Sequence, residues 1–117
     1  MTNTRQRGHA GEDAALAYLQ NQGLTLVTRN FAGRMGEIDL IMQDGNTLCF
    51  IEVRLRNNRN YASGAESITH NKIRKLIKTA QLYIMSHHQP PDINYRFDVV
   101  SLGSGIEWIK HAFTLDT

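Results

Sequence analysis

The sequence predicts an α/β sandwich built around a central mixed β-sheet, in the order helix, three strands, helix, two strands. Segments with helical spacing of apolar residues alternate with short β-rich segments, and Asp44-Gly45 between two apolar runs is a strong hairpin signal. The chain has 117 residues, a length that suits one core. We therefore expect residues 1–117 to form a single domain.

The first expected element is a helix over residues 7–22, in which Leu16 and Leu19 share a stripe with Glu12 and Ala15. The other expected elements are, in chain order, a strand at 24–31, a loop at 32–36, hairpin strands at 37–42 and 47–55, a loop at 57–65, a helix at 67–87 and strands at 95–102 and 106–111. The second helix has an apolar stripe along its length, and two prolines follow its end.

The hairpin predicts which side chains lie together. A turn at Asp44-Gly45 pairs Gln43 with Asn46 and sets Asp39 opposite Phe50. Because side chains alternate along a strand, one face is expected to be entirely apolar core: Ile38, Leu40, Met42, Cys49, Ile51, Val53 and Leu55.

The other face is apolar near the turn and charged at its far end. The charged end holds Glu37 opposite Glu52, with Asp39 and Arg54 beside them. Like charges across a sheet repel, and a divalent cation offsets that repulsion. Asp39 and Glu52 are expected to be diagonal neighbours, and oxygen-only ligands suit Mg²⁺. The alternative is a structural ion pair between Arg54 and one of these acids.

Glu12 is a further candidate for this acidic site. It shares the apolar stripe of the first helix, so we expect it to face the sheet. A carboxylate has little structural reason to point inward there. The alternative is that an acid near the start of a helix is stabilised by the helix dipole.

Basic residues follow the acids along the chain. Arg54, Arg56 and Arg59 fall within six residues, and the second helix carries Lys72, Arg74, Lys75 and Lys78. Such clusters suit phosphate contacts, and Arg56 and Arg59 would stand on the loop next to the acidic site. The alternative is a solvated, solubilising surface.

Composition excludes several classes of protein. The net charge of +2 excludes a strongly basic nucleic-acid coat. No apolar run approaches the roughly 20 residues of a membrane span, and the polar N-terminus lacks the apolar stretch of a secretory signal. The single cysteine, Cys49, is expected to be a small buried hydrophobe. We expect a cytoplasmic protein.

Five segments together resemble the bacterial YraN family, also called UPF0102. They are Gly11-Glu12, GEIDLI at 36–41, FIEVRLR at 50–56, RFDVV at 96–100 and Ala112-Phe113. The resemblance extends over nearly the whole chain. It implies membership of the PD-(D/E)XK nuclease superfamily, similarity to archaeal Holliday-junction resolvases, and a restriction-endonuclease-like three-layer core.

The resemblance also implies roles for individual residues. Asp39 and Glu52 would bind Mg²⁺ or Mn²⁺, with Glu12 assisting. Arg54 stands where the superfamily has a lysine that positions or activates water. Arginine stays protonated and cannot act as a general base, although it can hold a phosphate. A metal-activated water without a base, a lysine from elsewhere such as Lys72, or lost activity are the open outcomes.

The first functional hypothesis is a divalent-metal-dependent DNA endonuclease, acting on branched or single-stranded DNA. Its catalytic residues would be Glu12, Asp39, Glu52 and Arg54, and its substrate-binding residues Arg56, Arg59, Lys72 and Lys75. The alternative is a catalytically weak or inert DNA-binding module of the same fold, and a third possibility is a purely structural acidic cluster. A homodimer is expected by analogy with resolvases.

Overall fold

The computed structural model describes residues 4–56 and 68–114. Its elements are α1 (Thr4–Asn21), β1 (Thr25–Ala32), β2 (Glu37–Asp44), β3 (Thr47–Leu55), α2 (His70–Ser86), β4 (Asn94–Leu102) and β5 (Ile106–Phe113). The predicted order is confirmed. Helix α1 begins at Thr4 rather than residue 7, and the predicted loop at 57–65 lies outside the described residues.

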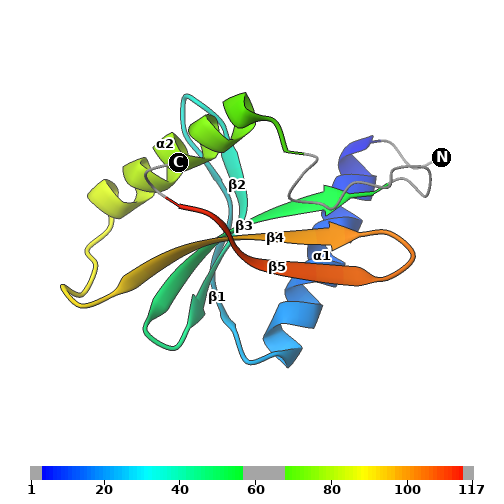
Figure 1. Cartoon of the computed structure of the whole chain (residues 1–117), viewed down its shortest axis with the longest axis horizontal. Helices are drawn as coiled ribbons and strands as arrows, with labels where there is room; N and C mark the ends of the chain where they lie inside the picture. Colours follow the sequence, from blue (N-terminus) through cyan, green and yellow to red (C-terminus); the bar gives the residue numbers. More distant parts are fainter. Residues whose placement is uncertain (1–3, 57–67, 115–117) are drawn as a thin grey trace.

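The strands form one five-stranded mixed sheet in the order β1-β2-β3-β4-β5 (Figure 1). Strands β3 and β4 are parallel, and every other neighbouring pair is antiparallel. Parallel neighbours need a crossover connection, and the segment between β3 and β4 contains α2. The mixed sheet predicted from the sequence is therefore present.

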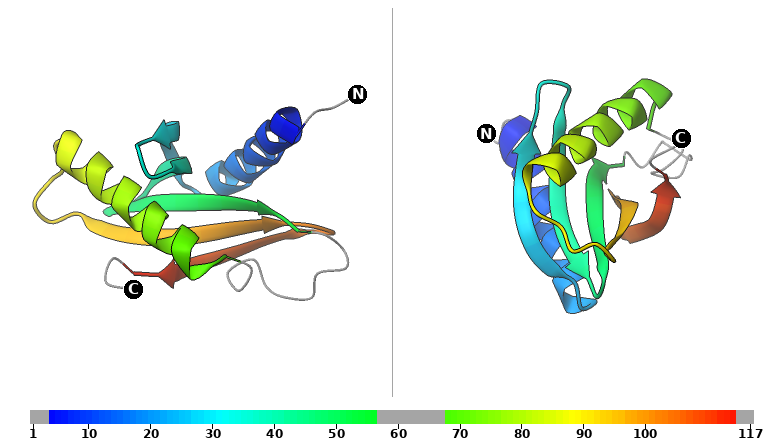
Figure 2. Two further views of the ribbon diagram at one scale, coloured as in Figure 1. Left: turned by 90° about the horizontal axis from the view of Figure 1, so that it is seen from above. Right: turned by 90° about the vertical axis from the view of Figure 1, so that its left-hand side faces the viewer.

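The two helices lie on opposite sides of the sheet (Figure 2). One core cluster joins α2 to the sheet, and a second joins α1 to it. The α1 side includes Leu19, Met42 and Cys49, each fully buried. Burial raises the pKa of the Cys49 thiol to about 12, so this residue is a packed hydrophobe, as predicted. The layers are those of the predicted restriction-endonuclease-like core.

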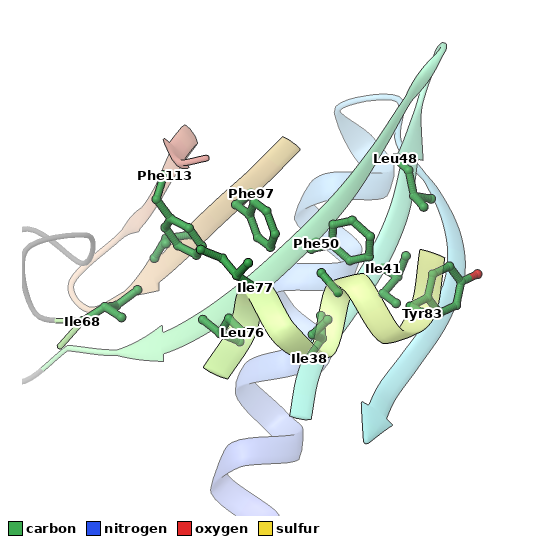
Figure 3. Packing of buried hydrophobic residues seen from close by; sticks show 12 residues of the cluster. Ile38, Ile41, Leu48, Phe50, Ile68, Leu76, Ile77, Tyr83, Phe97 and Phe113 are labelled. Carbon is green, nitrogen blue, oxygen red and sulfur yellow. The ribbon is translucent and has the colours of Figure 1, made fainter. Parts of the chain in front are cut away.

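Helix α2 forms where a cap and an apolar stripe coincide. The Thr69 hydroxyl accepts a hydrogen bond from the Lys72 backbone N–H at 3.2 Å, which caps the first turn. Figure 3 shows the buried face of the helix, where Leu76, Ile77 and Tyr83 pack on the sheet. Because this face is firmly packed, the position of Lys72 in the first turn of α2 is well defined relative to the sheet.

The hairpin register differs from the predicted one by two residues. The prediction paired Gln43 with Asn46, whereas the structure pairs Asp44 with Thr47. The turn therefore consists of Gly45 and Asn46, and Gly45 has a φ of 60°. Glycine adopts this left-handed conformation without strain, which makes Gly45 the first turn residue instead of the second. The predicted turn was wrong for this reason.

The register shift changes partners but not faces. The prediction placed Asp39 opposite Phe50 and Glu37 opposite Glu52, but Phe50 pairs with Ile41. The paired register ends at Leu40 and Ile51, and the next residues, Asp39 and Glu52, bring their carboxyl groups side by side. A shift of two residues preserves the face of every side chain.

One residue of the predicted apolar face, Ile38, lies on the other side of the sheet, and Leu55 stays on the α1 side but is not buried. Ile38 packs in the cluster on the α2 side, whereas Leu40 packs on the α1 side. The strict alternation is lost between them, beside Asn30 of β1, whose φ is 53°. Leu55 is 60% exposed at the end of β3. The rule of alternation failed at the point where the sheet departs from regular geometry.

Neither helix in the described part of the chain is long and apolar enough to span a membrane.

Candidate metal centre

Strands β2 and β3 bring two carboxylates to the middle of the sheet. Asp39 Oδ2 accepts a hydrogen bond from the Val53 backbone N–H at 2.8 Å. Glu52 is 4% exposed, and its carboxyl group lies beside that of Asp39. Together they line a cleft of about 340 Å³. The predicted pairing of Asp39 with Glu52 in one site is therefore present in the structure.

Helix α1 delivers Glu12 to the same cleft. A Cβ atom on Gly11 would lie 3.1 Å from Leu55 Cδ2 and 3.3 Å from Leu102 Cδ1, so the missing side chain lets the helix approach β3 and β4. Glu12 is 8% exposed and lines the cleft with Asp39. The helix dipole acts on charges within the first turn of a helix. Because α1 begins at Thr4, Glu12 lies beyond that turn. The dipole explanation for Glu12 is excluded.

Three carboxylates converge closely enough to share one cation. Oxygen atoms of Glu12, Glu37 and Asp39 all lie within 4.8 Å of one another. Glu37 is exposed, and the sequence analysis placed it in the acidic end of the sheet without naming it as a ligand. Glu52 neighbours Asp39 from the other side of the cleft but is outside this group of three. Asp39 and Glu12 are therefore common to the predicted ligand set and the observed cluster.

Two buried carboxylate oxygens lack hydrogen-bond partners among the described residues, namely Glu12 Oε1 and Glu52 Oε2. Each has a cation nearby instead: Arg29 Nη2 lies 3.5 Å from Glu12 Oε1, and Lys72 Nζ lies 3.1 Å from Glu52 Oε2. Buried polar atoms are nearly always hydrogen-bonded in folded proteins. These oxygens therefore have free capacity for another ligand.

Burial, together with a neighbouring acid, raises the pKa of Asp39 and of Glu12. Burial, followed by the adjacent Glu52, raises the pKa of Asp39 from 3.8 to about 8. Burial and the neighbouring Asp39 likewise raise the pKa of Glu12. A divalent cation near these carboxyl groups would favour their charged forms and so lower their pKa. An all-oxygen donor set that is under-bonded and mutually repulsive fits Mg²⁺ or Mn²⁺.

Arg29 of β1 is a site residue that the sequence analysis missed. Its guanidinium contacts Asp13 at 2.8 Å and Glu12 at 3.5 Å, so it ties the middle of α1 to the sheet. A charged residue in a strand of otherwise uncharged residues was the available signal. Its partners were not predictable because they come from a helix that meets the strand only in the folded chain.

The predicted basic residues divide into two groups. Lys72 and Arg54 line the cleft with the acids, and Lys75 lines an adjoining hollow of about 320 Å³ that also holds Glu37 and Asp39. The others lie elsewhere or outside the described residues: Arg56 pairs with Glu107 at 3.4 Å, and Arg59 falls within the undescribed segment 57–67. One open outcome was that a lysine from another element, such as Lys72, reaches the site. Lys72 of α2 does reach Glu52.

Asp98 has a structural environment. It is fully buried, and its carboxylate accepts hydrogen bonds from Arg96 Nε at 2.9 Å, Trp108 Nε1 at 3.0 Å and the His111 backbone N–H at 3.0 Å. Arg96 also reaches Asp44 at 3.0 Å. Every oxygen of Asp98 is therefore bonded, which sets this acid apart from those of the cleft.

Known proteins resemble this chain over nearly its full length. Residues 11–102 match the model of the uncharacterised protein family UPF0102. A UPF0102 protein of Vibrio cholerae is 45% identical over 116 residues, covering 96% of this chain and 95% of the relative. A Herminiimonas arsenicoxydans relative is 46% identical, covering 90% and 84%, and one from Legionella pneumophila is 43% identical, covering 94% and 96%. The chain belongs to the UPF0102 family.

Proposed function

We propose that this protein is a divalent-metal-dependent DNA endonuclease of the PD-(D/E)XK superfamily, similar to archaeal Holliday-junction resolvases. The observation that carries the proposal is the group of carboxylates of Glu12, Glu37 and Asp39 within 4.8 Å of one another, next to the buried Glu52. Such acids hold the metal ions of many phosphodiester hydrolases. The fold agrees with the superfamily.

Asp39, Glu12 and Glu52 would hold Mg²⁺ or Mn²⁺, with Glu37 as a further oxygen donor. The bound ion supplies Lewis-acid activation of water and phosphate. The protein contributes orientation: the Val53 N–H fixes one Asp39 oxygen at 2.8 Å, and the Asp39 carboxyl also lies within hydrogen-bond reach of Glu52. Burial of Glu12 and Glu52 lowers the local dielectric and strengthens their attraction for a cation.

Lys72 supplies the lysine that β3 lacks. Its Nζ lies 3.1 Å from Glu52 Oε2, and its side chain is 47% exposed, so it reaches both the acids and solvent. A lysine ammonium in this place can hold a nonbridging phosphate oxygen or orient water by donating a hydrogen bond. Arg54, on the same cleft, can hold the phosphate bidentately and stabilise charge in the transition state.

Cleavage assays on linear, single-stranded and junction DNA test this proposal. The wild-type protein should cleave at least one form in Mg²⁺ or Mn²⁺ and none in EDTA. Asp39→Asn and Glu52→Gln should each lower the rate at least 100-fold while leaving the fold intact, because each removes a charged metal ligand. Asp92→Asn is the matched control, because Asp92 is an exposed acid that does not line the cleft. Cleavage that survives both site substitutions would overturn the assignment.

One observation favours a second candidate function, an inert DNA-binding module. Arg54 replaces the lysine of the superfamily motif. Arg54→Lys separates the two candidates: a gain in cleavage indicates a weakened nuclease, whereas salt-sensitive DNA binding without cleavage by either protein favours the module. Lys72→Ala should be measured together with Arg54→Lys. If Lys72→Ala abolishes cleavage, Lys72 of α2 acts in place of the lysine that β3 lacks.

The proposal extends to the setting of the reaction. We place the activity in the cytoplasm, on branched or single-stranded DNA. We also propose a homodimer, by analogy with resolvases. Analytical ultracentrifugation with and without junction DNA tests the dimer separately from the chemistry.

A further inference from the structure

A second hollow lies between α2 and the turn that joins β1 to β2. Its volume is about 170 Å³, and it is lined by Gly33, Arg34, Met35, Lys78, Thr79 and Leu82. Met35 also lines the hollow that contains Glu37, Asp39 and Lys75. The two hollows therefore adjoin at Met35, and together we call them the α2 groove.

The wall of the α2 groove is built from backbone packed closely on the helix. A Cβ atom on Gly33 would lie 2.9 Å from Leu82 Cδ2, and one on Gly36 would lie 3.8 Å from Lys75 Cβ. The Gly33 N–H donates to the Gly36 carbonyl at 2.8 Å, which closes the turn. These contacts give the groove a defined shape before any ligand binds.

Positive charge follows the groove away from the acidic cluster. Lys72, Lys75 and Lys78 stand three residues apart on α2, and Arg34 adds a cation from the opposite wall. At a rise of 1.5 Å per residue, the three lysines span about 9 Å. The lysines therefore form a row of cations that can meet successive phosphates of one strand. Glu37, Asp39 and Glu52 line the groove at the end where it meets the acidic cluster.

Apolar side chains are exposed beside these cations. Met35 is 45% exposed and Leu82 is 44% exposed, and both line the hollow that contains Arg34 and Lys78. A duplex presents phosphates and keeps its bases stacked inside. An unpaired strand offers phosphates to the cations and a base face to the apolar floor.

We propose that the α2 groove binds single-stranded DNA and leads it to the acidic cluster. The backbone lies along Lys75, Lys78 and Arg34, and one unpaired base rests on Met35 and Leu82. This inference rests on the proposed nuclease function. It narrows the proposed substrate to DNA with a single-stranded segment next to the scissile bond.

Fluorescence anisotropy in EDTA tests the groove without cleavage. The probes are labelled dT12, an abasic 12-mer and a 12-base-pair duplex. Wild type should bind dT12 at least tenfold more tightly than either of the others. Lys78→Glu should weaken dT12 binding about tenfold, and Arg74→Glu, the same charge change on the same helix outside both hollows, should weaken it less than threefold.

A second pair of variants tests the apolar floor. Leu82→Ser should remove most of the preference for dT12 over the abasic strand, whereas Met85→Ser should leave it unchanged, since Met85 is 85% exposed and outside the hollow. Equal binding of dT12 and duplex, equal effects of Lys78→Glu and Arg74→Glu, or no binding at all would overturn the inference. If the wild-type protein binds dT12 in the groove but cleaves no DNA, the nuclease proposal is overturned instead.

Discussion

The buried Asp98 of β4 and the carboxylates of the cleft differ sharply in their hydrogen-bond partners. Asp98 has a partner for each oxygen, with Arg96, Trp108 and the His111 N–H all at 3.0 Å or less. The acids of the cleft repel one another, and Glu12 and Glu52 each keep an oxygen without a hydrogen bond among the described residues. Burial alone therefore does not distinguish an acid whose oxygens are all bonded from one that can take a further ligand, but the state of its partners does.

Asp98→Asn should produce the largest loss of stability. The substitution removes the buried charge that faces Arg96, leaving only the partly exposed Asp44 as its ion-pair partner, and turns an amide donor toward groups that already donate. Removing one partner of a buried pair costs about 3–5 kcal/mol. Urea unfolding monitored by circular dichroism measures the loss, with Asp92→Asn as an exposed control expected within about 0.5 kcal/mol. A loss below about 1 kcal/mol would show that the Asp98 network contributes little.

The cleft acids should make the metal-free protein less stable as pH rises. The folded state holds the Asp39 proton up to a pKa of about 8, against 3.8 as the ordinary value, while Glu52, Glu12, Glu37 and Lys72 face it. The unfolded chain loses that proton near pH 4, so the native state binds more protons between pH 4 and 8. This contribution to stability is complete below pH 4 and is lost as pH approaches 8.

Urea unfolding in EDTA at several pH values between 5 and 8 measures this dependence. The slope from one such group is at most about 1.4 kcal/mol per pH unit. Asp39→Asn retains an oxygen for the Val53 N–H and removes the charge, so it should flatten the profile and raise stability near pH 8. An unchanged slope in the variant would place the titration elsewhere.

Glu12→Gln should have the smallest effect on stability, less than about 1 kcal/mol, because the amide fills the same space and relieves repulsion from Asp39. It should still weaken Mn²⁺ binding about tenfold, equivalent to about 1.4 kcal/mol. Calorimetric titration measures this change. Glu107→Gln, on β5, is the matched control. Unaltered Mn²⁺ affinity in Glu12→Gln would remove Glu12 from the site.

The comparison also separates what local sequence could predict from what it could not. Strand alternation placed Asp39 and Glu52 on one face, and it remained valid when the turn shifted by two residues because parity was preserved. It failed at Ile38, where Asn30 on the neighbouring strand takes a left-handed conformation. That irregularity belongs to β1 and has no signal in the hairpin itself.

Contacts between distant elements account for the rest of the site. Lys72 reaches Glu52 from α2, and Arg29 reaches Glu12 across to α1. The sequence marked Lys72 only as one basic residue among several on its helix. The three-dimensional path of the crossover between β3 and β4 decides which lysine meets the acids, and that path depends on packing of the whole domain.

The most direct test of the acidic cluster is calorimetric titration of the metal-free protein with Mn²⁺ at neutral pH. We predict saturable binding to the wild type, at least a tenfold loss of affinity in Asp39→Asn, and no change in Asp92→Asn. Absence of binding to the wild type, or equal affinity in wild type and Asp39→Asn, would contradict the assignment of this cluster as a cation site.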